Sequence, residues 1–381
     1  MIYRTSLYCF SIAGLLSLGL FVLSYAFQFS DLYFFLAQFG MLSSGVILIA
    51  ILFSIWLIGK DRTNAFLLNI FLLTTTLFIV LLISEIAVRY IFKDITTTGD
   101  NTSYFARKWN KKNVKLNSMG FRETEFNLQK PKDYYRISFI GDSFTFGQGI
   151  EEDHRFSNLI GQYLVGKGAY QVLNFGTPGA ETVDHIATFK KSVLPAQPDF
   201  VILQWFMNDF EGKDKSQRPK RLPLLPSPYI RSGLHRYSAL YYLVNNRWNS
   251  FQLAFGPNET YAEYMHRRFK DSNSADSVLA VSEMREFIHE CKAEKIGIGI
   301  VLFPSFSYGQ QFAYLQQRVK DLCDLEGITC IDLSLVFDKY PDPFQLWVNR
   351  FDRHPGVVAN KLAADRIWET FLQIWLSQNE G

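Results

Sequence analysis

Long uncharged runs occupy the first part of the chain, and shorter apolar runs follow them. Between Thr5 and Ser84, the charged positions are Asp31 and the group Lys60–Arg62, which separate three uncharged runs. Each run exceeds the roughly 20 apolar residues needed to cross the hydrocarbon core of a bilayer. We therefore predict a membrane region over residues 1–95, with transmembrane helices at about 7–27, 33–58 and 65–88.

The distribution of Lys and Arg predicts the side of the membrane on which the rest of the chain lies. Arg4 and the Lys60–Arg62 turn would share one side, whereas the turn at Asp31 has no Lys or Arg. The positive-inside rule then places the later residues outside the cytoplasm, as in an integral protein of a bacterial inner membrane. A cleaved signal peptide ending near Ser24–Ala26 is the alternative, but the first run is long for one.

The pattern of apolar and polar residues changes near residue 134. Residues 96–133 are rich in Thr, Asn and Lys and predict a linker, mostly a solvated tether, although its ARKWNKKNVK stretch would suit anionic headgroups. From 134 to 378, short β-rich runs alternate with helical patterns. These runs are YRISFIG, YQVLNFG, DFVILQWF, IGIGIVLFP and GITCIDL. Continuous apolar strands separated by helices indicate a doubly wound α/β domain with a parallel sheet.

One segment of this domain, residues 210–275, breaks the alternation. It begins with the Pro-rich and basic stretch KDKSQRPKRLPLLPSP and continues with Tyr241, Tyr242 and Trp248. In a doubly wound fold, ligands bind at the carboxyl edge of the sheet, where the loops carry function. We therefore predict that this segment is an insertion over that edge.

Charge and cysteine content narrow the classes of function. A net charge of +3, with no basic stripe on a predicted helix, does not favour nucleic acid as a partner. No C-x-x-C or His/Cys cluster indicates zinc. Cys323 and Cys330 flank a short turn. They either pair in an oxidising space, leaving Cys291 free, or remain reduced thiols like it.

The first predicted strand ends in Gly141-Asp142-Ser143, which has two interpretations. Ser143 either caps the next helix or is a nucleophile at a strand end that binds ligands. The stretch is not the G-x-S-x-G elbow of α/β-hydrolases, because Thr145 stands at the second glycine position. It also lacks the G-K-[ST] of a phosphate loop. The choice between cap and nucleophile therefore depends on residues elsewhere.

Three later segments offer the partners that a nucleophilic serine needs: a base, an orienting acid and donors for an oxyanion. Gly179 follows the second predicted strand and Asn208 follows the third. Asp352 and His354 lie in FDRHPG, in a loop before the last amphipathic helix. Each residue alone is commonplace, but their order and their positions at strand ends together favour the nucleophile.

With these blocks the sequence resembles the SGNH/GDSL hydrolase superfamily over about residues 115–378. GDSFTFG, NFGTPG, FMND and DRHPG match its four blocks in order, and NSMGFR before the first strand resembles one branch of the family. The resemblance implies a flavodoxin-like fold, with Ser143 as nucleophile, His354 as base and Asp352 as orienting acid. The oxyanion hole that it implies consists of the N–H groups of Ser143 and Gly179 and the side chain of Asn208.

Two positions depart from the family pattern. The usual D-x-x-H is shortened to D-x-H, with Phe351 at the usual position of the acid, and Phe206 replaces the glycine two residues before the oxyanion asparagine. A competing dyad of Asp184 and His185 is disfavoured, because adjacent residues on a helix do not face each other. Asp142 adjoins the serine on the same turn and is interpreted as turn and cap chemistry.

The sequence as a whole predicts a membrane-anchored serine esterase that cleaves acyl esters, acetyl or short-chain, without a metal or organic cofactor. Its predicted partners are an acylated small-molecule, glycan or lipid substrate and the membrane that holds the N-terminal helices. Two alternatives stay open. One is an O-acyltransferase or deacetylase acting on envelope glycan or lipid, and the other is a non-catalytic glycan-binding module of the same fold.

Overall fold

A computed structural model describes residues 60–212, 214–256 and 259–379. These residues group into two compact units. The larger contains residues 95–101 and most of the chain from residue 105 onward, and the smaller combines helix α3 (Lys60–Ile91) with residues 102–104 and 222–251. The first two predicted transmembrane helices, at 7–27 and 33–58, lie outside the described residues.

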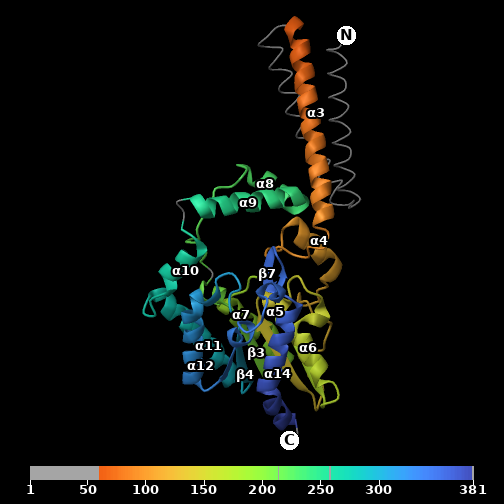
Figure 1. Cartoon of the computed structure of the whole chain (residues 1–381). Helices are drawn as coiled ribbons and strands as arrows, with labels where there is room; N and C mark the ends of the chain where they lie inside the picture. Colours follow the sequence, from red (N-terminus) through yellow and green to blue (C-terminus); the bar gives the residue numbers. More distant parts are fainter. Residues whose placement is uncertain (1–59, 213, 257–258, 380–381) are drawn as a thin grey trace. The chain divides into compact units, whose positions relative to one another are not determined.

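A five-stranded parallel sheet forms the centre of the larger unit (Figure 1). Its strands are β1 (Tyr135–Gly141), β2 (Tyr170–Gly176), β3 (Phe200–Trp205), β4 (Gly297–Leu302) and β5 (Thr329–Asp332). The strand order is β2-β1-β3-β4-β5, and every neighbouring pair is parallel. This flavodoxin-like order confirms the predicted doubly wound α/β fold. The carboxyl ends of β1 and β3 lie at its switch point, where such folds bind ligands.

Helices cover both faces of this sheet. They are α5 (Ser143–Phe146), α6 (Phe156–Leu164), α7 (Thr182–Thr188), α10 (Tyr261–Phe269), α11 (Ala275–Ala293), α12 (Ala313–Glu326), α13 (Ser334–Phe337) and α14 (Val357–Asn379). A further helix, α4 (Tyr104–Asn113), precedes β1 in the chain. An antiparallel hairpin of β6 (Trp347–Asn349) and β7 (Asp352–Pro355) precedes α14.

Two separate apolar cores result, one on each face of the sheet. Helices α7, α11 and α12 enclose the first, and α6 and α14 enclose the second. Neighbouring β3 residues divide between them, with Leu203 in the first core and Ile202 in the second. Successive strand side chains point to opposite faces, which explains why these strands are apolar at nearly every position. The first core also buries Cys291 and Cys323 as free thiols, and Cys330 is free as well.

A close backbone contact ties the end of β2 to helix α5. A Cβ atom added at Gly176 would lie 2.2 Å from the backbone nitrogen of Phe146. Asn174 bridges the same two segments, since its Oδ1 accepts from the Gly176 N–H (2.9 Å) and its Nδ2 donates to the Thr145 carbonyl (2.7 Å). Glycine at position 176 therefore allows α5 to lie directly against β2.

Residues 96–133, predicted to be mostly a solvated tether, are instead folded onto the larger unit. Helix α4 buries Phe105 and Trp109, and the ring of Phe121 packs edge-on against Phe175 of β2 (centroids 5.0 Å apart). The tether prediction is therefore wrong for most of this segment. Its few apolar residues are scattered among Lys and Asn, so no periodic pattern signals the packing.

The smaller unit contains α3, α8 (Pro228–Tyr237) and α9 (Ala239–Phe255) up to Phe251. Residues 222–251 of the predicted insertion thus group with α3, and their placement over the carboxyl edge of the sheet stays a prediction. The third predicted transmembrane helix, 65–88, is helical as part of α3. Within the described residues, none of the helices combines the length and the apolar character needed to cross a membrane.

A buried carboxylate fastens α9 to α3. Glu85 accepts hydrogen bonds from the first two backbone N–H groups of α9 (both 2.9 Å) and from the Ser238 hydroxyl (2.8 Å). The N-terminus of a helix favours such a negative charge. Arg89, one turn further along α3, pairs with Glu85 (2.6 Å) and donates to the Tyr237 carbonyl at the end of α8 (2.7 Å). The corner between α8 and α9 is therefore held by two side chains of α3.

We predict that Gly176→Ala destabilises the protein by about 1–3 kcal/mol, the usual cost of overpacking. Gly161→Ala is the matched control, because its Cβ would lie 3.8 Å from the nearest Val172 atom and alanine favours the α6 helix. Denaturant unfolding of both variants measures the difference. Equal stability of the two would show that β2 and α5 are not in close contact.

Candidate active site

Ser143 is the first residue of α5, directly after β1. The helix cap is Asp142, whose carboxylate accepts the Phe144 N–H (2.8 Å). Helix α5 ends at Gly147, where a φ of 74° requires the freedom of glycine. Because Asp142 supplies the cap, the Ser143 hydroxyl is left for another partner. The N–H of a residue in the first turn has no acceptor within its own helix.

His354 and Asp352 reach this hydroxyl from strand β7. His354 Nε2 lies 2.8 Å from Ser143 Oγ, and His354 Nδ1 lies 2.5 Å from Asp352 Oδ1. The three side chains thus form one line of hydroxyl, imidazole and carboxylate. In this arrangement an imidazole can remove the serine proton while the carboxylate orients the ring and stabilises its charged form.

The strand conformation of β7 explains the short D-x-H spacing. Side chains two residues apart on a strand point to the same side. Accordingly Asp352 is buried and His354 nearly so, while Arg353 between them is exposed. The backbone N–H of His354 also donates to Asp352 Oδ1 (3.0 Å). From the sequence, Asp352 and His354 are predicted to lie in a loop. A strand allows an acid two residues before the histidine to contact its ring.

The electrostatics of the pair favour a charged carboxylate beside a basic imidazole. Burial raises the pKa of Asp352, but the charge of His354 and hydrogen bonds from His354 and Thr97 outweigh it and lower this pKa to about 2. Burial lowers the pKa of His354, but the adjacent Asp352 carboxylate outweighs this and leaves it raised above its usual 6.5. Asp352 is therefore ionised at neutral pH, and His354 binds a proton readily.

A pocket of about 430 Å³ lies over Ser143, and Asp352, His354 and Asn208 also line it. Gly179 is not among the lining residues. It occupies a turn after β2 with φ of 77°, a left-handed conformation that favours glycine. The structure therefore brings four of the five predicted site residues into one pocket, and the fifth, Gly179, lies in the loop after β2.

The turn that carries Asn208 is held by a buried ion pair. Asp209 Oδ2 accepts the Phe206 N–H (2.8 Å), and Asp209 Oδ1 lies 2.9 Å from His185 Nε2. Phe206 itself is extended (φ −138°, ψ 160°), so the family glycine is not needed there. His185 thus pairs with Asp209 and not with its neighbour Asp184.

Comparison with known proteins places this site in a family. The sequence profile of the GDSL-like Lipase/Acylhydrolase family matches residues 139–362, more than half of the chain. The chain belongs to this family. It is an ester hydrolase of the SGNH type. A search of curated proteins found no match.

Solved structures similar to this esterase are remote in sequence. TesA is 11% identical with a TM-score of 0.41, and the match covers 63% of this chain and 99% of TesA. A lipase/acylhydrolase from Enterococcus faecalis is 16% identical with a TM-score of 0.39, covering 63% and 96%. The acetyl xylan esterase AlAXEase is 17% identical with a TM-score of 0.39, covering 61% and 98%.

Thr97 is a further residue at the site of the esterase, and no pattern in the sequence indicates it. The Thr97 hydroxyl donates to Asp352 Oδ2, the carboxylate oxygen that does not face His354, and Asn349 Nδ2 donates to the Thr97 carbonyl (3.0 Å). Thr97 is fully buried, in the segment just after α3. Thr97 and Asp352 are 255 positions apart, so no local pattern could have indicated the bond.

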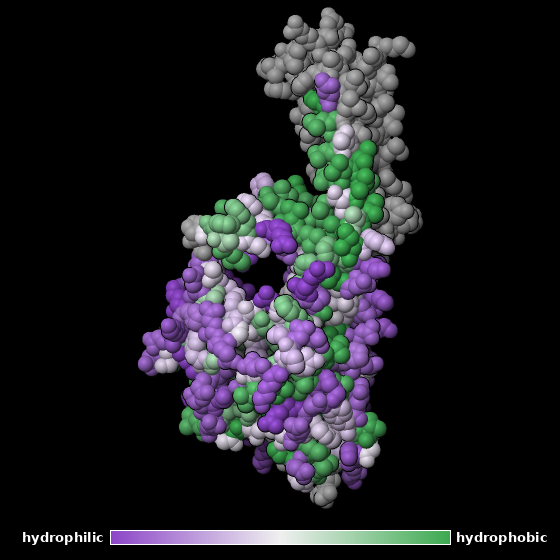
Figure 2. Space-filling view, in the orientation of Figure 1, coloured by the Kyte–Doolittle hydropathy of each residue, from purple (hydrophilic) through white to green (hydrophobic). Residues whose placement is uncertain are grey.

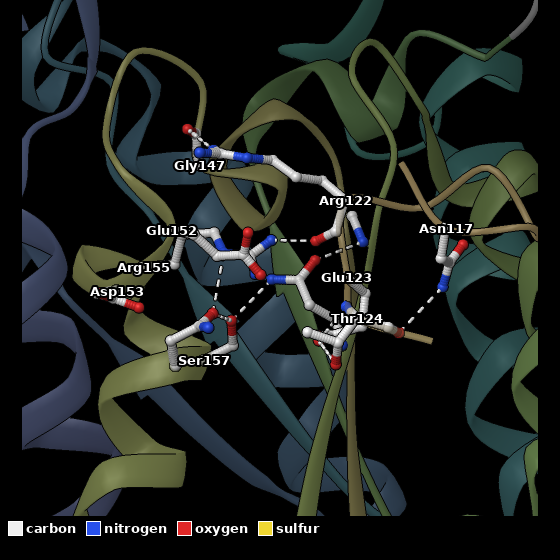
Figure 3. Close-up of polar contacts among 12 residues, drawn as sticks. Asn117, Arg122, Glu123, Thr124, Gly147, Glu152, Asp153, Arg155 and Ser157 are labelled. Atoms are coloured by element: carbon white, nitrogen blue, oxygen red, sulfur yellow. Dashed lines mark hydrogen bonds and ion pairs between the residues drawn. The ribbon is translucent and has the colours of Figure 1, made fainter. Parts of the chain in front are cut away.

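The NSMGFR stretch of the esterase holds the end of α5, the helix that begins at Ser143 (Figure 3). Arg122 is buried and donates to the carbonyls of Gly147 (2.8 Å), Phe146 (3.2 Å) and Ile150 (3.0 Å). The guanidinium of Arg155 in turn donates to the Arg122 carbonyl. These bonds fix the backbone that follows α5, which gives a structural reason for a stretch that resembled the family without a predicted role.

We predict that Thr97→Val lowers kcat for ester hydrolysis by roughly 10-fold with little change in KM. Loss of a hydrogen bond to a charged group costs about 1.5–3 kcal/mol and frees the carboxylate that orients His354. Thr97→Ser, which keeps the hydroxyl, should retain activity. Steady-state kinetics and thermal unfolding of both variants test this. Wild-type kcat in Thr97→Val would exclude a positioning role.

Proposed function

We propose that this esterase cleaves acyl esters with Ser143 as nucleophile, His354 as general base and Asp352 as orienting acid. The continuous line of hydrogen bonds from Ser143 through His354 to Asp352 carries the proposal. Its position at the carboxyl end of β1, beside the switch point of the sheet, is where a doubly wound fold binds its ligand.

In the first step His354 Nε2 takes the proton of Ser143 Oγ, and this oxygen attacks the carbonyl carbon of the ester. The tetrahedral intermediate collapses as the protonated His354 gives its proton to the departing alcohol, which leaves an acyl-serine. Water then loses a proton to His354 and attacks the acyl carbon. The second tetrahedral intermediate collapses as His354 gives this proton to Ser143 Oγ, which frees the serine and releases the carboxylic acid. Asp352 stabilises the charged imidazole in both halves of the reaction.

The negative charge that develops on the carbonyl oxygen needs hydrogen-bond donors. The Ser143 N–H at the start of α5 and the Asn208 side chain in the same pocket are proposed as two of them. The Gly179 N–H is proposed as the third, because its turn follows β2, the strand next to β1. Removing one such donor typically costs about 2.7–4 kcal/mol of transition-state stabilisation.

The lining of the pocket suits a short acyl group attached to a polar alcohol. Phe144, Phe206 and Phe351 offer apolar contact, and Arg350 and Arg353 lie at the polar side. We infer an acetyl or short-chain ester as substrate. Water or an acceptor hydroxyl could resolve the acyl-serine, and an acetyl-transfer assay with oligosaccharide acceptors separates an esterase from an acyltransferase.

We also propose that the N-terminal region anchors the esterase in a membrane with the larger unit outside the cytoplasm. The uncharged runs before residue 60 support this, and so do aliphatic side chains of α3 that are largely exposed, such as Leu73 (69%) and Ile83 (61%). A C-terminal alkaline phosphatase fusion should be active in cells. If only a matching cytoplasmic reporter fusion is active, the larger unit lies on the cytoplasmic side, opposite to this proposal.

Ser143→Ala should abolish hydrolysis of p-nitrophenyl acetate and labelling by a fluorophosphonate, with the thermal unfolding temperature unchanged. Ser307→Ala is the matched control, because Ser307 lines the same pocket and has no contact with His354 in the proposed mechanism. Mass spectrometry of the labelled wild type should locate the adduct on Ser143. Labelling that persists in Ser143→Ala would place the nucleophile elsewhere, and no labelling of the wild type would favour a non-catalytic module.

The pH dependence of kcat/KM should show a rise through an inflection above pH 6.5, because only neutral His354 can accept the serine proton and Asp352 raises the pKa of His354. Asp352→Asn removes that charge. The inflection should then move to lower pH, and the rate should fall on the order of 10⁴-fold. A pH–rate profile of the variant whose inflection is unmoved would show that another carboxylate acts on His354.

A further inference from the structure

A second pocket lies within the smaller unit, between α8 and α9. It measures about 420 Å³ and is lined mainly by polar side chains that donate hydrogen bonds. The donors are Arg231, Ser232, His235, Arg236, Tyr241 and Asn245. No Asp or Glu is among the residues that line this pocket. Two guanidinium groups with hydroxyl and amide donors are the chemistry that binds a phosphate group.

The charged side chains of the segment around the pocket are all basic. Residues 222–251, which contain α8 and most of α9 and are here called the arm, include three arginines and no Asp, Glu or Lys. Arg231 donates one hydrogen bond to the Leu225 carbonyl (3.0 Å), and a guanidinium has five N–H donors in all. A positive field without internal carboxylates attracts anions and is not neutralised from within the arm.

The arm also exposes large apolar side chains on the two helices that line the pocket. On α9, Val244 and Phe251 are 45% and 54% exposed. They lie on one helical stripe with Trp248, whose ring stacks on Phe251 (5.9 Å between centroids). On α8, Tyr229 is 89% exposed and lies seven positions before Arg236, on the same side of the helix. Aromatic, aliphatic and Arg side chains on one surface are typical of helices that lie in a membrane interface.

The attachment of the arm favours a lipid as the source of the phosphate. Glu85 and Arg89, near the end of α3, hold the α8–α9 corner through hydrogen bonds. Figure 2 shows hydrophobic residues along the described part of α3 and over parts of the arm. A basic pocket fastened to the end of such a helix, beside exposed aromatic side chains, is placed to meet headgroups and the adjoining acyl chains together.

We propose that the arm binds the phosphate of an anionic phospholipid headgroup, with Arg231 and Arg236 as the principal contacts. Tyr229, Val244 and Phe251 would enter the apolar layer beside it. This lipid site is separate from Ser143, and its function does not depend on the esterase mechanism.

The full-length protein in detergent micelles is titrated with three probes: dihexanoyl phosphatidylglycerol, dihexanoyl phosphatidylcholine and inorganic phosphate. Thermophoresis of the labelled protein should show that phosphatidylglycerol binds at least about 10-fold more tightly than the other two. Arg231→Gln with Arg236→Gln should weaken its binding by about 30-fold, at about 1 kcal/mol for each Arg near an anionic surface. Hydrolysis of p-nitrophenyl acetate should be unchanged.

Arg285→Gln with Arg366→Gln is the matched control, because both arginines are exposed on helices of the larger unit and the change in charge is the same. Equal loss of binding in this control would mean that net charge alone attracts the lipid, and would overturn the proposal. So would equal affinity for the two lipids. Inorganic phosphate that binds as tightly as phosphatidylglycerol would reveal a free-phosphate site instead.

A second variant tests the same pocket in case the arginine variant does not fold. Ser232 is exposed on α8, and Ser232→Asp places a negative charge in the pocket without removing a guanidinium. It should weaken phosphatidylglycerol binding at an unchanged thermal unfolding temperature. Undiminished binding in Ser232→Asp would overturn the proposed pocket even if the arginine variant fails to fold.

Discussion

The proposed active site of the larger unit depends on the hydrogen bond between Ser143 Oγ and His354 Nε2, which is 2.8 Å long. It joins the end of β1 to a hairpin 211 positions later in the chain. Both ends must be held within a few tenths of an ångström for proton transfer. On the serine side, Gly176 lets α5 lie on β2, and Arg122 holds the carbonyls behind it. On the histidine side, the same precision comes from β7.

In both units, buried carboxylates hold neighbouring segments together through hydrogen bonds. Asp352 accepts from His354 and Thr97, Asp209 holds the Asn208 turn together with His185, and Glu85 caps α9. Removing a carboxylate from water is costly unless its oxygens accept several hydrogen bonds. Each of these carboxylates accepts at least two, and at least one of them comes from another segment of the chain. They therefore specify which segments meet, in addition to any effect on stability.

The segment predicted as a linker, residues 96–133, has an unexpected role. Its Thr97 contacts the acid of the proposed triad, and Gly149, in the loop after α5, would meet the Thr97 hydroxyl if it carried a Cβ. A segment predicted as a tether thus forms part of the site. The cause of the error is physical. Thr97 lies in a polar stretch without periodicity, and the residues that it meets, Asp352 and Gly149, are more than 50 positions away.

The sequence by itself determined the five strands, their parallel arrangement and the blocks that end in Ser143, Asn208 and His354, because apolar runs buried on both faces and motifs at strand ends are local signals. Only the tertiary structure decided that Asp352 contacts His354 across a D-x-H spacing, since side chains two residues apart share one side of a strand but not of a helix. It also decided that His185 pairs with Asp209, that Phe206 needs no glycine conformation and that residues 222–251 join α3. Each of these depends on contacts between residues distant in the chain or on a backbone conformation that the neighbouring residues do not encode.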